Sequence, residues 1–473
     1  MEGNWLSIIP PLTTIVNAIF TKRIISSLLF GLIVGSILKA GSLFTGIFKA
    51  VEYLMGVLNS ADNILVVLFL FSFGSLTEIF KMSGGIKGFA RLAEKYVKTE
   101  KGALLSVWAV TPVTYLDCCF HTISSGTIAK PLIEKVNGSP ERLALVVNVT
   151  SSQLIVLIPL ATTYVGYIIG ITGSAMREAG IPGSPYALFL ESIPYNFYSW
   201  GMVILSLLVT LFGLGFGKIR VKWGKPDQEG VHGMDEAHEQ CKFEEKAPPK
   251  VWNLLLPLLV LVILVILLFW YTGYTPGRSF VQALMHAQFE KSLFIATFGT
   301  LLLTAVFYLL QRIPLSEIDS HFLSGGTEML PPIVVLVISW ALAAVTRDLG
   351  FQKFIMGAFG TGFPKLFIPV MVFIIGALTS YFIGSSWATW ALIMPLGLPL
   401  AVNSGASIPL VMGAILAGGS VGDSVSFLGE TPILTAAITE LPLLDHIQTT
   451  LPYAGIIAGL AAILFIVSQL MIG

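Results

Sequence analysis

The sequence predicts an all-α membrane protein with many membrane segments, and three features support this prediction. Hydrophobic residues make up 55% of the 473 residues and charged residues only 11%, whereas soluble domains contain about 25% charged residues. The mean hydropathy is +0.84. The apolar residues form long uncharged runs, unlike the alternating ten-residue segments of a β-barrel. Because the net charge is zero and no basic tail is present, the composition excludes the usual nucleic-acid-binding proteins.

Apolar runs of about 20 residues predict the individual spans. Two further apolar pieces, 118–133 and 386–402, are interrupted by polar residues, and we interpret them as crossings or re-entrant hairpins. Together these elements give about 12–14 membrane segments. The uninterrupted candidates are 5–20, 24–38, 62–80, 102–116, 143–170, 200–217, 251–271, 291–311, 331–346, 366–384, 408–440 and 451–471.

One strongly hydrophilic stretch, 218–250, contains seven basic and seven acidic residues. Its composition predicts an aqueous linker between a first membrane repeat, 1–217, and a second, 251–473. The positive-inside rule counts Lys and Arg in short loops. It places the linker in the cytoplasm with most of the basic residues, provided that the two interrupted pieces cross or re-enter the membrane. We therefore expect a multi-pass protein of a bacterial-type inner membrane.

The same order of polar elements occurs in both halves and predicts an internal repeat. In each half a hydroxyl-rich turn leads into Pro-Leu, a turn ending on proline follows, and a small polar break then interrupts a hydrophobic helix. Duplicated halves with interrupted helices are typical of secondary transporters. We therefore predict two inverted repeats with broken helices. The matching elements are Ser124–Leu132, Asn137–Pro140 and Thr150–Ser152 in the first half, and Ser386–Leu396, Asn403–Pro409 and Gly418–Ser420 in the second.

Three acidic residues at the predicted breaks are candidates for binding Na⁺ or H⁺. An ionisable residue at membrane depth costs several kcal/mol, and a carboxylate beside hydroxyls and a helix break offers the hard oxygens that Na⁺ prefers. Asp117 and Asp423 are the predicted Na⁺ ligands, and Glu430 follows a Gly-rich stretch expected to unwind. The alternative for each acid is a helix cap or turn residue. Neighbouring candidates for the ion- or proton-binding set are Ser424, Ser426 and Thr431.

A second group of polar residues is a candidate substrate-binding set. Trp387 could equally be a membrane-interface anchor, and the hydroxyl and amide side chains could equally join helices. His121 lies near Cys118 and Cys119, but no structural zinc spacing is present, so we interpret it as a protonatable or packing residue. Glu78 with Lys81 is interpreted as a surface ion pair. The set is His121, Thr122, Ser124, Ser125, Asn148, Ser151, Ser152, Ser385, Ser386, Trp387 and Thr389.

These residues favour a carrier over an enzyme or a channel. An intramembrane aspartyl protease would also use two buried carboxylates, but no acid pair with a water-activating arrangement can be identified. A channel would share the broken helices, whereas carboxylates that couple a proton to a cation favour a carrier. No cofactor is expected; Na⁺ and H⁺ are expected as transported or coupling ions.

The chain resembles the NhaC family of sodium/proton antiporters over almost its whole length. The most specific matches are Leu116–Leu132, Gly384–Pro395 and Gly418–Thr431. Members of that family follow the counterpart of Asp117 with a second acid, where this chain has Cys118, and they end that stretch in Phe-Asn, where this chain has Phe-His. After the Gly-Asp pair the family has His-Cys-Ser-Pro-Ile-Ser-Asp-Thr, and this chain has Ser-Val-Ser-Phe-Leu-Gly-Glu-Thr.

The resemblance implies a cation/proton exchanger with inverted repeats and with Asp117, Asp423 and Glu430 as carriers of charge. The predicted mechanism is alternating access, in which Asp117 and Asp423 bind Na⁺ or H⁺ in mutually exclusive fashion. Some family members exchange organic acids or amino acids, so Na⁺- or H⁺-coupled transport of a small amino acid or carboxylate is the alternative. The expected partners are the small ion or solute and the lipid bilayer, with no nucleic acid, and a homodimer is compatible with the sequence.

Overall fold

The computed structural model describes residues 5–213, 250–351, 353–354 and 364–472. The described part is helical and contains no strand, which confirms the predicted all-α class. Most of the predicted linker, 218–249, lies outside the described residues. The division into 1–217, 218–250 and 251–473 therefore stays a prediction.

The described part of the first half contains eleven α-helices and four short irregular turns of helix. Three of these α-helices, α3, α5 and α10, were not among the predicted spans. The α-helices are α1 (Ile9–Thr21), α2 (Ile24–Ala40), α3 (Leu43–Leu58), α4 (Ala61–Lys81), α5 (Gly85–Tyr96), α6 (Glu100–Thr114), α7 (Cys118–Lys135), α8 (Pro140–Val149), α9 (Thr163–Ala179), α10 (Pro185–Ser192) and, completing the half, α11 (Phe197–Phe212); the irregular turns are η1 (Trp5–Ile8), η2 (Thr150–Leu154), η3 (Ile155–Leu157) and η4 (Ile193–Tyr195).

The described part of the second half continues in the same helical manner. A short turn, η6 (Lys365–Phe367), precedes α19. The α-helices are α13 (Trp252–Gly273), α14 (Phe280–Met285), α15 (Phe289–Leu310), α16 (Leu315–Glu328), α17 (Leu330–Asp348), α19 (Ile368–Ile383), α20 (Ser386–Ser404), α21 (Ile408–Val425), α22 (Glu430–Thr439) and α23 (Leu443–Ile472).

Seven of the described helices are long and apolar enough to cross a membrane, or nine if each of two bent pairs counts as one span. Other predicted segments correspond to shorter helices, such as α6 and α7, or to α20, which contains Pro395 and Pro399. Helix α3 was not predicted as a span because Lys49 and Glu52 interrupt its apolar sequence. It continues from α2 after a bend of 119° at Gly41, whose φ of +74° is accessible mainly to glycine.

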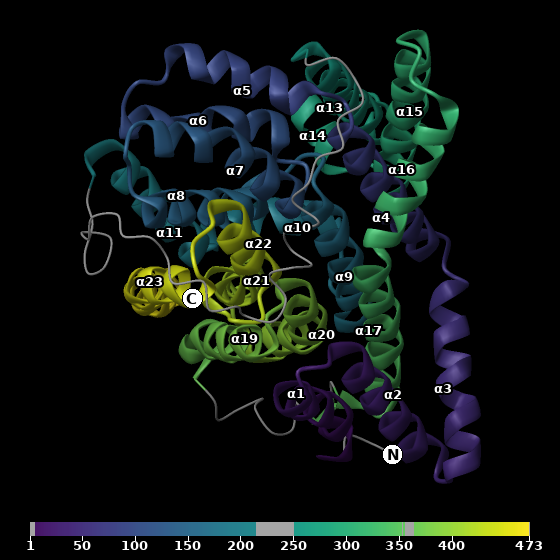
Figure 1. The fold of residues 1–473 in the computed structure, drawn as a ribbon. Helices are drawn as coiled ribbons and strands as arrows, with labels where there is room; N and C mark the ends of the chain where they lie inside the picture. The colour runs from purple at the N-terminus through teal and green to yellow at the C-terminus, as the bar shows by residue number, and fades with distance from the viewer. Residues whose placement is uncertain (1–4, 214–249, 352, 355–363, 473) are drawn as a thin grey trace.

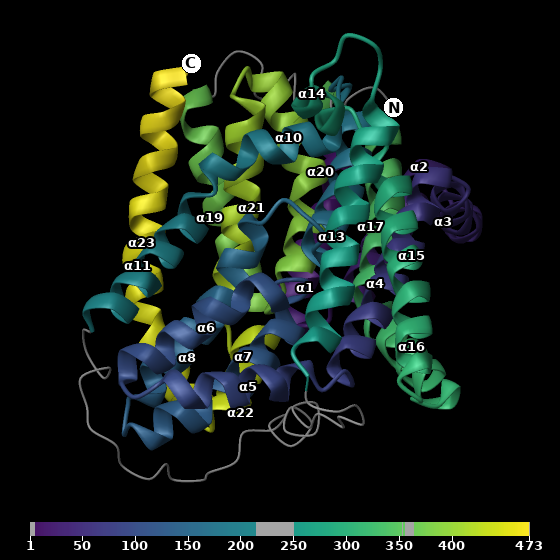
Figure 2. The same cartoon turned by 90° about the horizontal axis from the view of Figure 1, so that it is seen from above.

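Many of the helices run side by side along one direction. Figure 2 shows α13, α15, α17, α19, α21 and α23 in roughly parallel array, with α2 and α3 projecting to one side. In Figure 1 the short helix α22 lies near the centre, with α7 and α8 on one side and α20 on the other. Helix α22 packs against α7 and α8. Residues far apart in the sequence are thereby brought to the centre of the molecule.

The second-half helix break is shorter than the sequence predicted. We expected unwinding from Gly418 onward with a break between Asp423 and Glu430; α21 continues through Gly418–Ser420 to Val425, and the break covers only 426–429. The glycines allow close packing instead. A Cβ atom on Gly418 would lie 2.7 Å from the Phe373 carbonyl oxygen on α19, and one on Gly419 would collide with the Trp390 indole on α20. In membrane helices small residues commonly serve such close approach.

Helices α4 and α16 pack through a reciprocal pair of glycines, Gly74 and Gly325. A Cβ on either residue would collide with the carbonyl oxygen of the other, and a backbone atom cannot move aside without shifting a helix. We expect Gly325→Ala to destabilise the protein by about 1–3 kcal/mol, measured as a lower unfolding temperature in detergent. Gly455→Ala is the matched control, because a Cβ there meets no atom within 4 Å. Equal behaviour of the two variants would contradict the assigned packing.

Candidate functional site

A partly enclosed cavity of about 190 Å³ lies where the first turns of five helices meet. We call it the carboxylate cavity, because three acidic residues line it. Helix N-termini carry partial positive charge from their unpaired N–H groups, so the five first turns stabilise negative charge there. The lining residues used below are Asp117, Cys118 and Cys119 at the start of α7, Ser385 and Trp387 at the start of α20, Glu430 at the start of α22, Glu328 at the end of α16, Pro331 and Pro332 at the start of α17, and Ile24 and Ile25 at the start of α2.

Asp117 is both the N-cap of α7 and a wall of the carboxylate cavity. Its Oδ1 accepts hydrogen bonds from the backbone N–H groups of Cys119 at 3.0 Å and Phe120 at 3.1 Å. Its Oδ2 accepts from the Thr163 hydroxyl on α9 at 3.0 Å. Asp117 is therefore a helix cap, as the alternative predicted, but these hydrogen bonds do not use every acceptor position of its carboxylate. Two oxygens offer about four acceptor positions, and three are used by these bonds.

Asp423 and Glu430 flank the second-half break and face different surroundings. Glu430, the first residue of α22, lines the carboxylate cavity. Asp423, in the last turn of α21, is buried, and its Oδ2 accepts a hydrogen bond from Tyr164 at 3.4 Å. Ser386, at the start of α20, lies beside this carboxylate. Glu430 is close enough to interact electrostatically with both Asp117 and Asp423.

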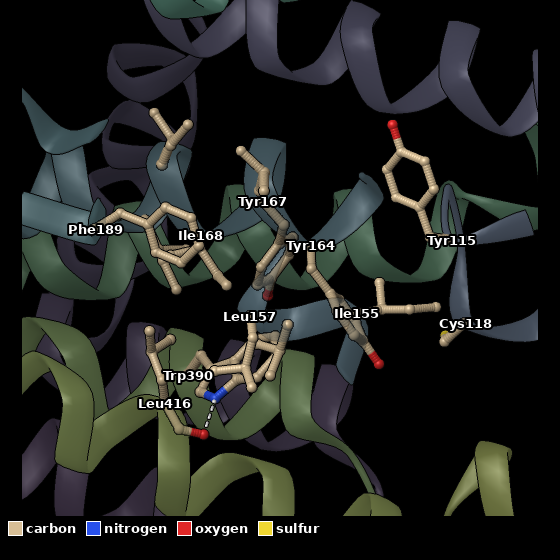
Figure 3. Packing of buried hydrophobic residues seen from close by; sticks show 14 of the residues in the cluster. Tyr115, Cys118, Ile155, Leu157, Tyr164, Tyr167, Ile168, Phe189, Trp390 and Leu416 are labelled. Carbon is tan, nitrogen blue, oxygen red and sulfur yellow. Dashed lines mark hydrogen bonds between the residues drawn. The ribbon is translucent and has the colours of Figure 1, made fainter. Parts of the chain in front are cut away.

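Tyr164 on α9 lies between Asp423 and the start of α7 that carries Asp117. Its hydroxyl, which donates to Asp423, also lies beside the Cys118 thiol, and Figure 3 shows it directed toward Cys118. The Tyr164 ring packs edge-on against Trp390, at 5.3 Å between ring centroids, and at a tilt against Trp387, at 4.9 Å. The Trp390 indole is held in turn by a bond to the Leu416 carbonyl, the dashed line of Figure 3. Tyr164 thus lies between the first-half and second-half breaks.

A network of two acids, a lysine and a histidine extends from the carboxylate cavity between α4 and α16. Lys81 Nζ lies 2.5 Å from Glu78 and 3.4 Å from Glu328, and His321 Nδ1 lies 3.4 Å from Glu78. We interpreted Glu78 and Lys81 as a surface pair, and that interpretation is wrong. Their side chains are only 13% and 14% exposed, because α16 covers them. Lys81 brings positive charge close to an otherwise acidic cavity.

The first-half break joins α21 through amide side chains. The predicted break at Thr150–Ser152 is confirmed, because η2 is a wide π-type turn over Thr150–Leu154. Gln153 Nε2 donates to the Ser420 carbonyl at 2.8 Å and to the Ser424 hydroxyl at 3.0 Å. Asn148 Nδ2 donates to the backbone carbonyl of Asp423 at 3.2 Å. The first-half break and the end of α8 therefore contact the C-terminal part of α21.

Several of the other predicted residues make local bonds in the structure, and their roles in transport stay predictions. His121 is fully buried between the Thr114 and Thr150 hydroxyls, at 2.6 and 3.0 Å, and does not line the carboxylate cavity. In the turn after α21 the Ser426 hydroxyl accepts from the Leu428 backbone N–H and donates to the Tyr381 carbonyl on α19. The hydroxyls of Thr122, Ser125, Ser151, Ser152 and Thr389 donate to the backbone carbonyl three or four residues earlier. Ser124, Ser386 and Thr431 are buried.

The sequence reasoning did not select Tyr164, Thr163, Gln153, Lys81 or Glu328. Tyr164 and Thr163 follow the first-half break directly, so the repeat could have drawn attention to them. Gln153 directly follows the predicted residues Ser151 and Ser152, and its amide can both donate and accept hydrogen bonds. The sequence around Lys81 and Glu328 shows only local charges. It does not predict that the two residues meet, because their proximity depends on how α4 and α16 pack.

The comparisons with known proteins identify the family. The family model described as the Na⁺/H⁺ antiporter family matches residues 154–470, which is more than half of the chain. The chain belongs to the Na⁺/H⁺ antiporter family. As a family member it is a multi-pass membrane protein and a secondary transporter, and it is not an enzyme. This agrees with the resemblance and with the carrier interpretation of the breaks.

Three relatives match the chain by sequence. A protein of Haemophilus influenzae described as uncharacterized is 28% identical over 98% of this chain and 90% of its own length. The arginine/ornithine antiporter ArcD of Halobacterium salinarum is 34% identical over 30% of this chain and 29% of its own length. The malate-2H⁺/Na⁺-lactate antiporter of Bacillus subtilis is 30% identical over 32% of each chain.

Two solved structures share the fold. The YdaH transporter of Alcanivorax borkumensis superposes with a TM-score of 0.61, at 14% identity, over 90% of this chain and 88% of that one. MtrF of Neisseria gonorrhoeae, described with a class of antimetabolite efflux pumps, superposes with a TM-score of 0.63, at 16% identity, over 92% and 86%. At these identities the likeness concerns the fold alone. The inverted relation of the two halves stays a prediction.

Proposed function

We propose that the protein exchanges Na⁺ for H⁺ across a cell membrane by alternating access. The observation that carries the proposal is the placement of three carboxylates, Asp117, Asp423 and Glu430, at helix breaks from both halves of the chain. Asp117 and Glu430 face one cavity, and Tyr164 bonds Asp423 and lies beside Cys118 in the cavity wall. Oxygen ligands suit Na⁺, and each carboxylate is also a proton acceptor.

In the proposed cycle Na⁺ and H⁺ occupy the same carboxylate oxygens at different times. Proton binding to Asp117 or Asp423 removes the negative charge that attracts Na⁺, so the two ions exclude each other. Rocking of one helix bundle then opens the site to the other side of the membrane. The breaks at η2 and 426–429 are suitable hinge positions, because the regular helical hydrogen bonding is already interrupted there.

Coupled transport of a small amino acid or carboxylate is the second candidate, and two observations favour it. The carboxylate cavity is about 190 Å³, whereas one water molecule needs roughly 10–15 Å³ of such volume, so an organic solute fits. Five helix N-termini open into it, and such termini commonly receive anionic substrate groups in transporters. The relatives named above for arginine/ornithine and for malate and lactate exchange are consistent with this candidate.

The test uses purified protein in liposomes that contain a trapped pH-sensitive dye. Na⁺, K⁺ and Li⁺ are added first, and a panel of amino acids and carboxylic acids is added afterwards. A pH change caused by Na⁺ alone supports Na⁺/H⁺ exchange. No response to cations, together with a response to one organic solute, would overturn that proposal in favour of the second candidate.

A further inference from the structure

Two free cysteines lie side by side in the carboxylate cavity, and the proposed exchange mechanism uses neither. Cys118 and Cys119 begin α7, and their sulfur atoms are 3.7 Å apart. Both residues line the cavity. In a tetrahedral site two sulfurs bound at about 2.3 Å each lie about 3.8 Å apart. The two thiols are thus already spaced as ligands of one metal ion.

Carboxylates lie beside these thiols and complete a coordination set. One ligand atom each from Asp117, Cys118 and Cys119 lies within 4.8 Å of the others. Asp117 keeps one acceptor position after its three hydrogen bonds. Glu430, which begins α22 directly after the second-half break, lies beside the Cys119 thiol. Two sulfur and two oxygen ligands at the wall of an accessible cavity match the preferences of Zn²⁺ and Cd²⁺.

We propose that Cys118, Cys119 and Asp117, with Glu430, form a binding site for a thiophilic divalent cation such as Zn²⁺ or Cd²⁺. Binding converts two thiols to thiolates and releases their two protons to water, with no change in oxidation state. The bound ion occupies the carboxylates that the exchange mechanism requires. Transport is therefore blocked while the ion is bound and recovers when a chelator removes it.

The experiment measures metal binding directly in a variant that leaves the site intact. The chain has three cysteines, so Cys241→Ser leaves Cys118 and Cys119 as the only thiols. The full-length variant in detergent is titrated with Cd²⁺, and the ultraviolet thiolate-to-Cd²⁺ charge-transfer absorbance is followed. We expect a saturable signal with one Cd²⁺ per chain that excess Mg²⁺, a hard cation, does not displace.

Further substitutions in the Cys241→Ser background assign the ligands. Cys118→Ser and Cys119→Ser should each lose at least about half of the absorbance, because each removes one of two thiolates. Asp117→Asn should keep the absorbance and weaken Cd²⁺ binding roughly tenfold, about 1.4 kcal/mol. No signal in a monodisperse Cys241→Ser protein, or an unchanged signal in Cys119→Ser, would overturn the proposal. Because binding is read without transport, Cd²⁺ binding to a protein that exchanges no ions would overturn only the proposed function.

Discussion

Replacing Asp117 by asparagine is expected to reduce Na⁺-dependent proton movement in liposomes to the level of protein-free vesicles. Asparagine is as good an N-cap as aspartate, and its side-chain oxygen still accepts the bonds from Cys119 and Phe120. The start of α7 is therefore kept, while the carboxylate charge is lost and the amide nitrogen in place of Oδ2 no longer accepts from the Thr163 hydroxyl. Since that charge binds Na⁺ or H⁺ in the proposed cycle, exchange stops. The measurement is the dye response to an added Na⁺ gradient.

Two comparisons separate loss of charge from loss of structure. Asp117→Ala removes the cap as well as the charge, so it should show the same transport loss. Its free energy of unfolding should also fall by about 1 kcal/mol, seen as a lower unfolding temperature. Thr163→Val removes the hydroxyl that bonds Oδ2 but leaves the charge, so exchange should be reduced and not abolished. Full exchange by Asp117→Asn would remove this residue from the mechanism.

Lys81→Met is expected to destabilise the protein by about 3 kcal/mol, because it leaves Glu78 and Glu328 without their cation. Methionine fills much of the lysine volume, so the effect comes from charge and less from a cavity. The readout is the unfolding temperature in detergent. We also expect the variant to lose most of its exchange activity, since Lys81 is the cation that lies close to Asp117 and Glu328.

The control for this prediction also neutralises Glu78, the carboxylate that Lys81→Met leaves unpaired from lysine. In Lys81→Met with Glu78→Gln both members of the tightest pair are neutral, and replacing a buried pair as a unit is often close to neutral in energy. The double variant should recover at least half of the lost stability. If it is as unstable as Lys81→Met alone, packing and not charge explains the role of Lys81.

Composition and the lengths of the apolar runs were sufficient for the fold class and for most helix positions. The apolar runs at 62–80, 251–271 and 291–311 became α4, α13 and α15 with only small shifts at their ends. The predicted unwinding at Gly418–Ser420, which α21 does not show, marks the limit of this reasoning. Glycine raises the cost of a helix in isolation, but Gly418 and Gly419 are needed for contact with α19 and α20. Which of these two roles a glycine has depends on neighbours that are distant in sequence.

The sequence predicted the polar content of the site better than its geometry. Asp117 and Glu430 could be selected because acids at membrane depth are costly, and both line the carboxylate cavity. His121 was selected for its chemistry, yet Thr114 and Thr150 hold it away from the cavity. Tyr164 joins the two breaks, and no local pattern marks a tyrosine for that position. Partners of this kind are fixed by helix packing and not by spacing.

The claim that Na⁺ and H⁺ share the same carboxylates is tested most directly by measuring protons released when Na⁺ binds. Purified protein in weakly buffered detergent solution is mixed with Na⁺ at neutral pH, and the pH change is followed with an indicator, with choline as the control cation. The account predicts proton release that saturates with Na⁺ and is absent from Asp117→Asn combined with Asp423→Asn. Saturable Na⁺ binding without proton release, or release that survives in the double variant, would contradict it.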